Sequence, residues 1–321
     1  MLSLLVSRLS SFVERIRVLQ DLSTGVFQSP WMSGRTRSSS RQKDPRDRVD
    51  SPQVIEGTET AKRQRKITTN PSSSSHSSSS STPTPSSLDE IPLVVSSIRL
   101  IFDDHRDPKN AEKMKSYMRD QFSYIGLKKP IRAALTKPLI DEWSGSYQDL
   151  DTLVHHLWQM PEREYQYFAM DLMSKPRQLK ILNSHAPESL NLVERCIRQS
   201  SWWDTVDMLS SKLVGSIVTT NPHLLSTMDA WNEDHNLWIR RSSLLFQLMY
   251  KPPVLDIERQ FRFVQNLMHE QDFFIRKAIG WVLRQHSKID KKHQAMVSQF
   301  ITDHQEKLSK LSIREGSKYL K

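Results

Sequence analysis

A serine-rich tract divides this 321-residue chain into two parts of very different composition. Residues 72–81 are nine serines and one histidine, and TPTPSS follows them. Such a stretch cannot bury enough apolar surface to offset the conformational entropy lost on ordering. We therefore expect a disordered Ser/Pro-rich and basic linker over residues 20–87 and a folded domain over residues 88–321.

Residues 1–19 differ from the linker, because they form an amphipathic segment with several arginines and a single acid, Glu14. Its apolar positions at helical spacing are Leu5, Leu9, Phe12 and Ile16. This composition is typical of an organellar targeting peptide. The alternative is an incidental N-terminal helix.

A basic cluster, AKRQRK at residues 61–66, lies within the linker. Clusters of this kind are typical of nuclear localisation signals, although many are only solvated tails. We expect a nuclear protein, with a mitochondrial or other organellar location through residues 1–19 as the alternative.

The composition excludes several classes of function. One cysteine cannot build a Cys-rich zinc site or an iron–sulfur cluster, and the 8 glycines include no GxxxxGK[ST] or GxGxxG motif. No apolar run approaches the ~20 residues of a membrane-spanning helix. We therefore expect no cofactor, no metal and no membrane partner. The net charge of +10 instead favours a polyanionic partner.

The apolar pattern beyond residue 95 is helical throughout. In residues 272–287, apolar side chains recur three and four residues apart, at Ile275, Ala278, Ile279, Val282 and Leu283. Prolines interrupt the pattern every fifteen to twenty residues, which predicts about a dozen short helices. We expect an all-α fold of antiparallel helical pairs, either a bundle or a curved HEAT-like solenoid. A solenoid is favoured because its concave surface suits a long polyanion.

One helix, beginning near residue 201, combines an aromatic ring and a carboxylate on one face. Trp203 and Asp207 are four residues apart and therefore neighbours on its surface. Ser201 and Asp204 are spaced as a capping box, so we interpret Asp204, the rival carboxylate, as a helix-start cap. The alternative is that Trp203 packs against a neighbour and Asp207 is an ordinary surface acid. The predicted buried stripe is Trp202, Val206, Leu209 and Leu213.

Two later helices repeat the combination of aromatic and charged residues. Trp238 and Arg241 share a face, and Arg240 lies beside them. Off the apolar stripe of the next helix lie Lys277, Trp281 and Arg284. Cations can neutralise phosphates and indole rings can meet bases or sugars, so the pattern favours a nucleic-acid groove.

These three segments, residues 201–207, 237–248 and 273–284, resemble the DNA alkylation repair family of AlkD-like HEAT-repeat DNA glycosylases. Residues 113–130, 161–173 and 311–320 resemble other parts of the same family, in the same order. The resemblance covers about 95–321. It implies a curved stack of helical pairs that binds double-stranded DNA containing alkylated bases and excises cationic N3- and N7-alkylated purines without a metal or redox cofactor.

The resemblance also implies roles for individual residues. The catalytic aspartate matches Asp207, and the two DNA-facing tryptophans match Trp203 and Trp281. The phosphate-binding arginine matches Arg241, and an early tyrosine matches Tyr117. The loop that contacts the DNA backbone matches Lys128, Lys129 and Pro130, where two lysines replace the family's polar pair.

The predicted DNA-binding set also includes the cations of the later helices, Arg240, Lys277 and Arg284. We expect a monomer. The alternative function is that of a non-catalytic HEAT-repeat DNA-binding or scaffold protein, because a fold by itself does not determine a function.

Overall fold

The computed structural model describes residues 91–320, and within this range the chain forms helices and turns without a β-strand. An isolated bridge between Ser123 and Glu162 is the extended pairing recorded there. The all-α prediction is confirmed. The predicted targeting segment and the predicted linker lie outside the described residues.

The first half of the described chain contains α2 (Ile91–Asp104), α3 (Pro108–Tyr117), α4 (Lys129–Glu142), α5 (Tyr147–Trp158), α6 (Arg163–Met173), α7 (Pro176–Ser184) and α8 (Ala186–Arg198). The second half contains α9 (Trp203–Met208), a π-helical segment (Leu209–Val214), α10 (Gly215–Thr220), α11 (Leu225–Asn232), α12 (Leu237–Leu245), α13 (Ile257–Leu267), α14 (Phe273–His286), α15 (Lys291–Asp303) and α16 (Lys310–Gly316).

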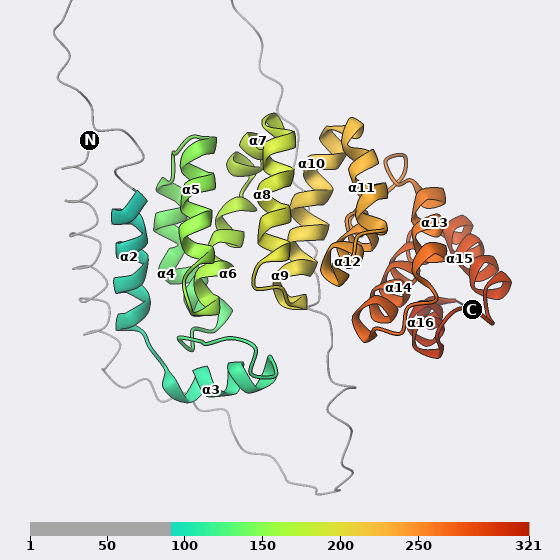
Figure 1. Ribbon diagram of the computed structural model, residues 1–321, viewed down its shortest axis with the longest axis horizontal. Coiled ribbons are helices and arrows are strands. Elements are labelled where there is room, and N and C mark those ends of the chain that lie inside the picture. Colours follow the sequence, from blue (N-terminus) through green and yellow to red (C-terminus); the bar gives the residue numbers. More distant parts are fainter. Residues whose placement is uncertain (1–90, 321) are drawn as a thin grey trace, which may run out of the picture. The chain divides into compact units, whose positions relative to one another are not determined.

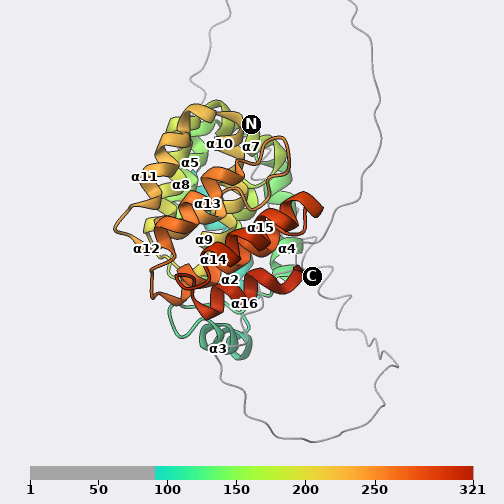
Figure 2. The same cartoon turned by 90° about the vertical axis from the view of Figure 1, so that its right-hand side faces the viewer.

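The helices follow one another along the long axis in chain order, from α2 at one end to α15 and α16 at the other (Figure 1). Helix α3 lies apart from this row, as the end-on view also shows (Figure 2). Helices close in sequence pack together, as α5 with α6, α11 with α12 and α14 with α16 do. This arrangement is consistent with a solenoid, while the HEAT-like pairing stays a prediction.

Helix α14 shows how the predicted pattern becomes structure. Its N-cap residue, Asp272, accepts hydrogen bonds from the amides of Phe274 at 2.7 Å and Ile275 at 3.3 Å. Such a cap contributes about 1 kcal/mol. The predicted stripe from Ile275 to Leu283 is fully buried. Gly280 allows close approach of α16, because a Cβ atom there would lie 2.5 Å from Cβ of Glu315.

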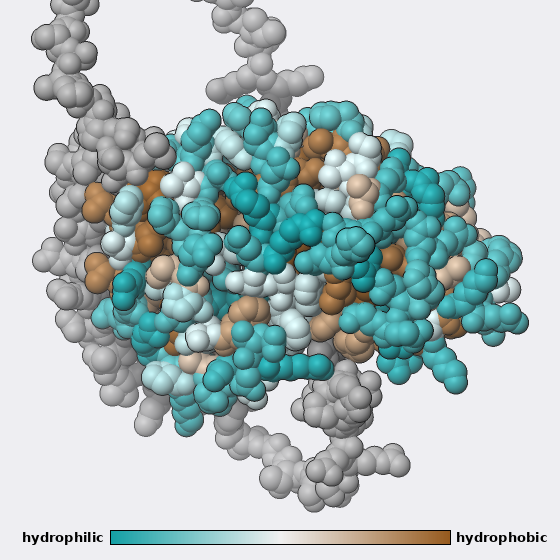
Figure 3. Space-filling model, viewed as in Figure 1, coloured by the Kyte–Doolittle hydropathy of each residue, from teal (hydrophilic) through white to brown (hydrophobic). Residues whose placement is uncertain are grey.

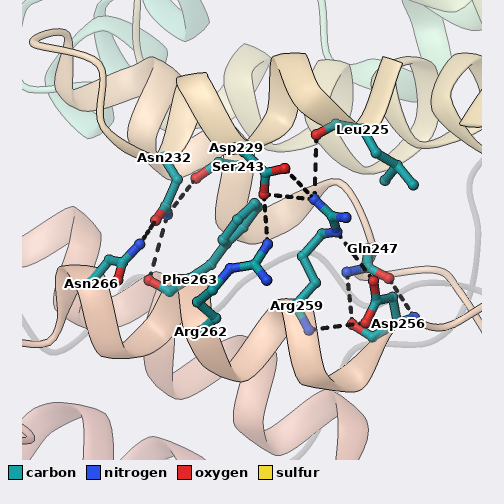
Figure 4. A network of polar contacts seen from close by, with 10 residues as sticks. All are labelled: Leu225, Asp229, Asn232, Ser243, Gln247, Asp256, Arg259, Arg262, Phe263 and Asn266. Carbon is teal, nitrogen blue, oxygen red and sulfur yellow. Dashed lines mark hydrogen bonds and ion pairs between the residues drawn. The ribbon is translucent and has the colours of Figure 1, made fainter. Parts of the chain in front are cut away.

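Polar side chains join α11 to α13 (Figure 4). Asp229 of α11 accepts hydrogen bonds from Arg259 at 2.6 Å and Arg262 at 2.7 Å, both on α13. The buried Asn232 donates to Ser243 at 3.0 Å and accepts from Asn266 at 2.9 Å. Buried polar groups that are satisfied in this way fix the register of neighbouring helices. The face of the described domain that Figure 3 shows is mainly hydrophilic, with scattered apolar patches.

A buried carboxylate holds the loop that leads into α4. Glu164 of α6 accepts hydrogen bonds from the backbone amides of Ile125 at 3.0 Å, Gly126 at 2.8 Å and Leu127 at 3.0 Å. Gly126 has a φ of +103°, and a Cβ atom there would lie 2.1 Å from the carbonyl oxygen of Asp107. The loop can therefore take only this path, which sets where α4 begins.

Candidate active site

Helix α9 is short and continues directly into the π-helical segment Leu209–Val214. Val206, Leu209 and Leu213 are fully buried, as the predicted stripe requires. Trp202 is only partly buried, and its ring packs against those of Trp238 and Phe274 at centroid distances of 5.6 and 5.1 Å. Single π-helical turns within helices are frequent at functional sites, and the apolar spacing did not reveal this one.

The predicted capping role of Asp204 is wrong. Helix α9 begins after Trp202, which makes no side-chain cap, and the Ser201 hydroxyl donates to a carbonyl of α8 instead. The Asp204 carboxylate pairs with the guanidinium of Arg163 at 2.7 and 2.9 Å and accepts a hydrogen bond of 2.6 Å from the Tyr167 hydroxyl. A charge-assisted, two-point pair with a buried arginine stabilises a carboxylate more than a backbone cap does.

The surroundings of Asp204 leave it no room for a substrate. Its side chain is 5% exposed, and Arg163 is fully buried. Arg163 also donates to the carbonyl of Ser200 at 2.7 Å and to the hydroxyl of Thr205 at 2.8 Å. Burial raises the pKa of Tyr167, so its hydroxyl stays a donor. The network therefore joins α6 to the start of α9.

Asp207 lies one turn later and has a different environment. Nε and Nη2 of Arg241 donate to its two carboxylate oxygens at 2.8 and 2.9 Å. The Asp207 side chain is 13% exposed, whereas that of Arg241 is 4% exposed. Nη1 of Arg241 donates to the carbonyl of Phe274. One guanidinium thus connects α9, α12 and α14, the three helices that carried the aromatic and charged motifs.

Burial and the ion pair with Arg241 shift the pKa of Asp207 in opposite directions. Burial raises the pKa of the Asp207 carboxyl above its ordinary value, and the charge and the hydrogen bonds of Arg241 oppose this effect without cancelling it. Arg241 therefore favours the ionised carboxylate at a position where desolvation favours the neutral acid. A carboxylate poised in this way, and still partly open to solvent, is a candidate for chemistry.

An aromatic side chain of α3 contacts one of α9, the helix that carries Asp207. The rings of Tyr117, the last residue of α3, and Trp203, the first residue of α9, form an edge-to-face pair with centroids 6.1 Å apart. Tyr117 is 54% exposed and Trp203 is partly exposed. Trp281, also partly exposed, lies on α14 two turns beyond Phe274. The predicted aromatic residues are therefore available at the surface.

The predicted cations fall into two groups, exposed lysines at the start of α4 and cations of α12 and α14 that pair with carboxylates. Lys128 and Lys129 are exposed at the start of α4. Arg240 instead pairs with Glu270 at 2.7 Å and donates to two backbone carbonyls. On α14, Lys277 and Arg284 both pair with one residue of α16, as described next.

Glu315 organises the cations of α14. Arg284 approaches its carboxylate at 2.5 Å, Lys318 at 2.9 Å and Lys277 at 3.3 Å. Burial opposes ionisation of Glu315, but Lys318, Lys277 and Arg284 outweigh that effect and lower its pKa to about 2. Lys277 and Arg284 thus neutralise a carboxylate of the protein, an arrangement that helix spacing could not indicate.

Residues 91–320 hold neither a cluster of metal-ligating side chains nor a membrane-spanning helix. No set of three or more His, Cys, Asp or Glu side chains there could hold a metal ion. In the same part of the chain, no helix combines the length and the apolar character needed to cross a bilayer.

Fold and site together define an all-α protein with a partly open carboxylate–arginine pair beside surface aromatic rings. A family model described as DNA alkylation repair enzyme matches residues 98–320. Because the match covers most of the sequence, the chain belongs to the DNA alkylation repair enzyme family, and its role is in DNA repair.

A solved structure is also similar. It is described as a predicted DNA alkylation repair enzyme from Enterococcus faecalis, and its sequence is 32% identical to this one. The match covers 67% of this chain and 96% of the solved chain, with a TM-score of 0.55. A search of curated proteins found no match.

Proposed function

We propose that this protein is a DNA glycosylase that hydrolyses the N-glycosidic bond of cationic N3- or N7-alkylated purines in duplex DNA. The observation that carries the proposal is the ion pair of Asp207 and Arg241. The Asp207 carboxylate is partly exposed and is held at both oxygens by the Arg241 guanidinium, whereas the nearby Asp204 is enclosed by Arg163 and Tyr167.

The chemistry needs only one carboxylate. An N3- or N7-alkylated purine already carries a positive charge, so it takes the electron pair of the breaking N-glycosidic bond and departs as a neutral base. Positive charge then develops at C1′ of the deoxyribose, where the Asp207 carboxylate stabilises it, as carboxylates do in glycoside hydrolysis. Water adds to C1′ and gives its proton to Asp207 or to solvent.

Arg241 acts on this reaction through Asp207. Two of its N–H groups orient the carboxylate, and a third anchors the guanidinium to Phe274 of α14. The other two N–H groups of the guanidinium are the ones that the predicted phosphate contact would use. Arg241 is therefore first a positioning residue in this proposal.

Aromatic faces supply further stabilisation of the cationic substrate. The rings of Trp203 and Trp281 would each contribute on the order of 1–2 kcal/mol to a desolvated cation placed over them. The edge contact with Tyr117 restricts the ring of Trp203 before substrate binds. Less ordering of the site is then needed when DNA arrives.

The test is release of 7-methylguanine from a methylated duplex by the wild type and by Asp207→Asn. We expect the variant to bind the duplex with unchanged affinity and to lose excision by at least ~100-fold, as removal of a transition-state contact does. Release at the wild-type rate by Asp207→Asn would refute the assignment. Duplex binding by a wild type that releases no base would instead identify a non-catalytic binding protein.

A further inference from the structure

The exposed lysines at the starts of α4 and α7 and on the π-helical segment differ from the predicted cations of α12 and α14, and one of them, Lys129, belongs to the loop that was predicted to contact the DNA backbone. Lys129, Lys175 and Lys212 are exposed, and none of them forms an ion pair within residues 91–320. The cations of α12 and α14 that were predicted to bind DNA are all paired with carboxylates. Positive charge without a carboxylate partner within residues 91–320 therefore lies at the starts of α4 and α7 and on the π-helical segment.

Packing brings the three lysines together from separate helices. Arg132 of α4 reaches Asp171 of α6 at 3.2 Å, which holds the start of α4 beside the end of α6. The hydroxyl of Ser174, at the end of α6, lies 3.6 Å from the sulfur of Met208, the residue after Asp207. Lys175 immediately follows Ser174. The two lysines at the starts of α4 and α7 thus lie near the π-helical segment that carries Lys212.

The electrostatics agree with this proximity. Partial burial lowers the pKa of the Lys212 ammonium; Asp171 opposes this effect, and the positive charges of Lys175 and Lys129 add to it. Asp171 is already shared with Arg132, so the cations outnumber the acid at this place. Their mutual repulsion would be relieved by a bound polyanion.

Two helix starts add to the positive potential beside these lysines. Lys128 and Lys175 are the N-cap residues of α4 and α7, and neither makes a side-chain cap. Proline occupies the first turn of each helix, at Pro130 and Pro176. The remaining free amides and the helix dipole favour an anion next to the lysine side chains.

We infer that Lys129, Lys175 and Lys212 form a lysine track that binds the sugar–phosphate backbone of duplex DNA on the α4–α7 side of Asp207. This inference rests on the proposed function, because it places the backbone beside the proposed catalytic carboxylate. Lys212 follows Asp207 by five residues through the π-helical segment, so the track ends close to that carboxylate. Contact with consecutive phosphates would anchor the strand that carries the lesion.

The test measures the affinity for a short unmodified duplex as a function of salt. The variant replaces Lys129, Lys175 and Lys212 by Gln, and the control replaces Lys180, Lys291 and Lys292, three other exposed lysines, by Gln. Each lost phosphate contact lowers the slope of log affinity against log salt by about 0.9, so the track variant should lose nearly 3. The control should keep the wild-type slope. An unchanged slope in the track variant, or an equal loss in the control, would overturn the inference.

A second readout separates charge from shape at Lys212. The lowered pKa means that Lys212 loses its proton at a lower pH than an ordinary lysine, so wild-type affinity should begin to fall at a lower pH than a contact made by an ordinary lysine would. Lys212→Arg keeps its charge and should bind with the wild-type salt slope but without this decline. Identical pH dependence in both proteins would contradict a contact between Lys212 and phosphate.

Measuring base excision together with the salt slope distinguishes failure of the lysine track from failure of the glycosylase proposal. If the wild type releases 7-methylguanine and the track variant keeps the wild-type salt slope, the lysine track is wrong and the glycosylase proposal stands. If no base is released but the salt slope falls in the track variant alone, the track is a DNA-binding surface and the glycosylase proposal fails.

Discussion

Two aspartates on one short helix form ion pairs with arginine, and the pairs differ in what else surrounds them. Asp204 has Arg163 and Tyr167 as partners and a side chain that is 5% exposed. Among residues 91–320, Asp207 has Arg241 as its single side-chain partner, and its side chain is 13% exposed. The chemistry of the two groups is the same, so burial and the number of partners distinguish the buried Asp204 from the aspartate that we propose to be reactive.

The largest effect on stability should come from Asp204→Asn. The change leaves the buried Arg163 guanidinium without its counter-charge and weakens the acceptor of Tyr167. Loss of one partner of a buried ion pair costs about 3–5 kcal/mol, which denaturant unfolding can measure.

The matched change, Asp207→Asn, should cost clearly less, because its side chain reaches solvent and one amide oxygen still accepts from Arg241. If both variants lost equal stability, the distinction between a structural and a reactive aspartate would fail.

Arg241→Gln should lower excision by about 10- to 100-fold, through loss of the geometry of Asp207. It also removes the charge and the hydrogen bonds that lower the pKa of Asp207, so burial and the negative charge of Asp204 would then raise that pKa unopposed. The acid limb of the rate against pH should therefore move to higher pH. An acid limb at the wild-type position would mean that Arg241 does not act through Asp207.

A third carboxylate, Glu315, extends the comparison to stability at acidic pH. Its substitution should have the smallest effect of these changes. Its pKa falls to about 2 in the folded protein, below the ordinary value of 4.5. This stabilisation is present above the unfolded-state pKa and is lost as the pH falls from there toward 2. Glu315→Gln should therefore cost of order 2 kcal/mol at neutral pH and little at pH 2.

The control for this change is the pH dependence of unfolding for both proteins. Their free energies of unfolding should converge as the pH falls. A constant difference across the whole range would show that Glu315 contributes packing instead of charge.

Much of the fold was predictable from single helices. The periodic apolar positions of α14 predicted its buried face, because they depend on residues within a few turns. The four-residue spacing of Trp203 and Asp207 similarly predicted a shared face. The capping role given to Asp204 failed for the same reason, since local spacing does not reveal a partner 41 residues away.

The sequence by itself determined the helical class, the family and the candidates Asp207, Trp203 and Trp281. Only the tertiary structure decided which aspartate is buried with two partners and that Arg241 joins three helices. It also decided that Lys277 and Arg284 neutralise Glu315, while Lys129, Lys175 and Lys212 form no ion pair within the described residues. The physical reason is that helical periodicity records the direction of a side chain around its own axis. The pairing of charges depends on which helices pack together, and desolvation then makes each pairing decisive.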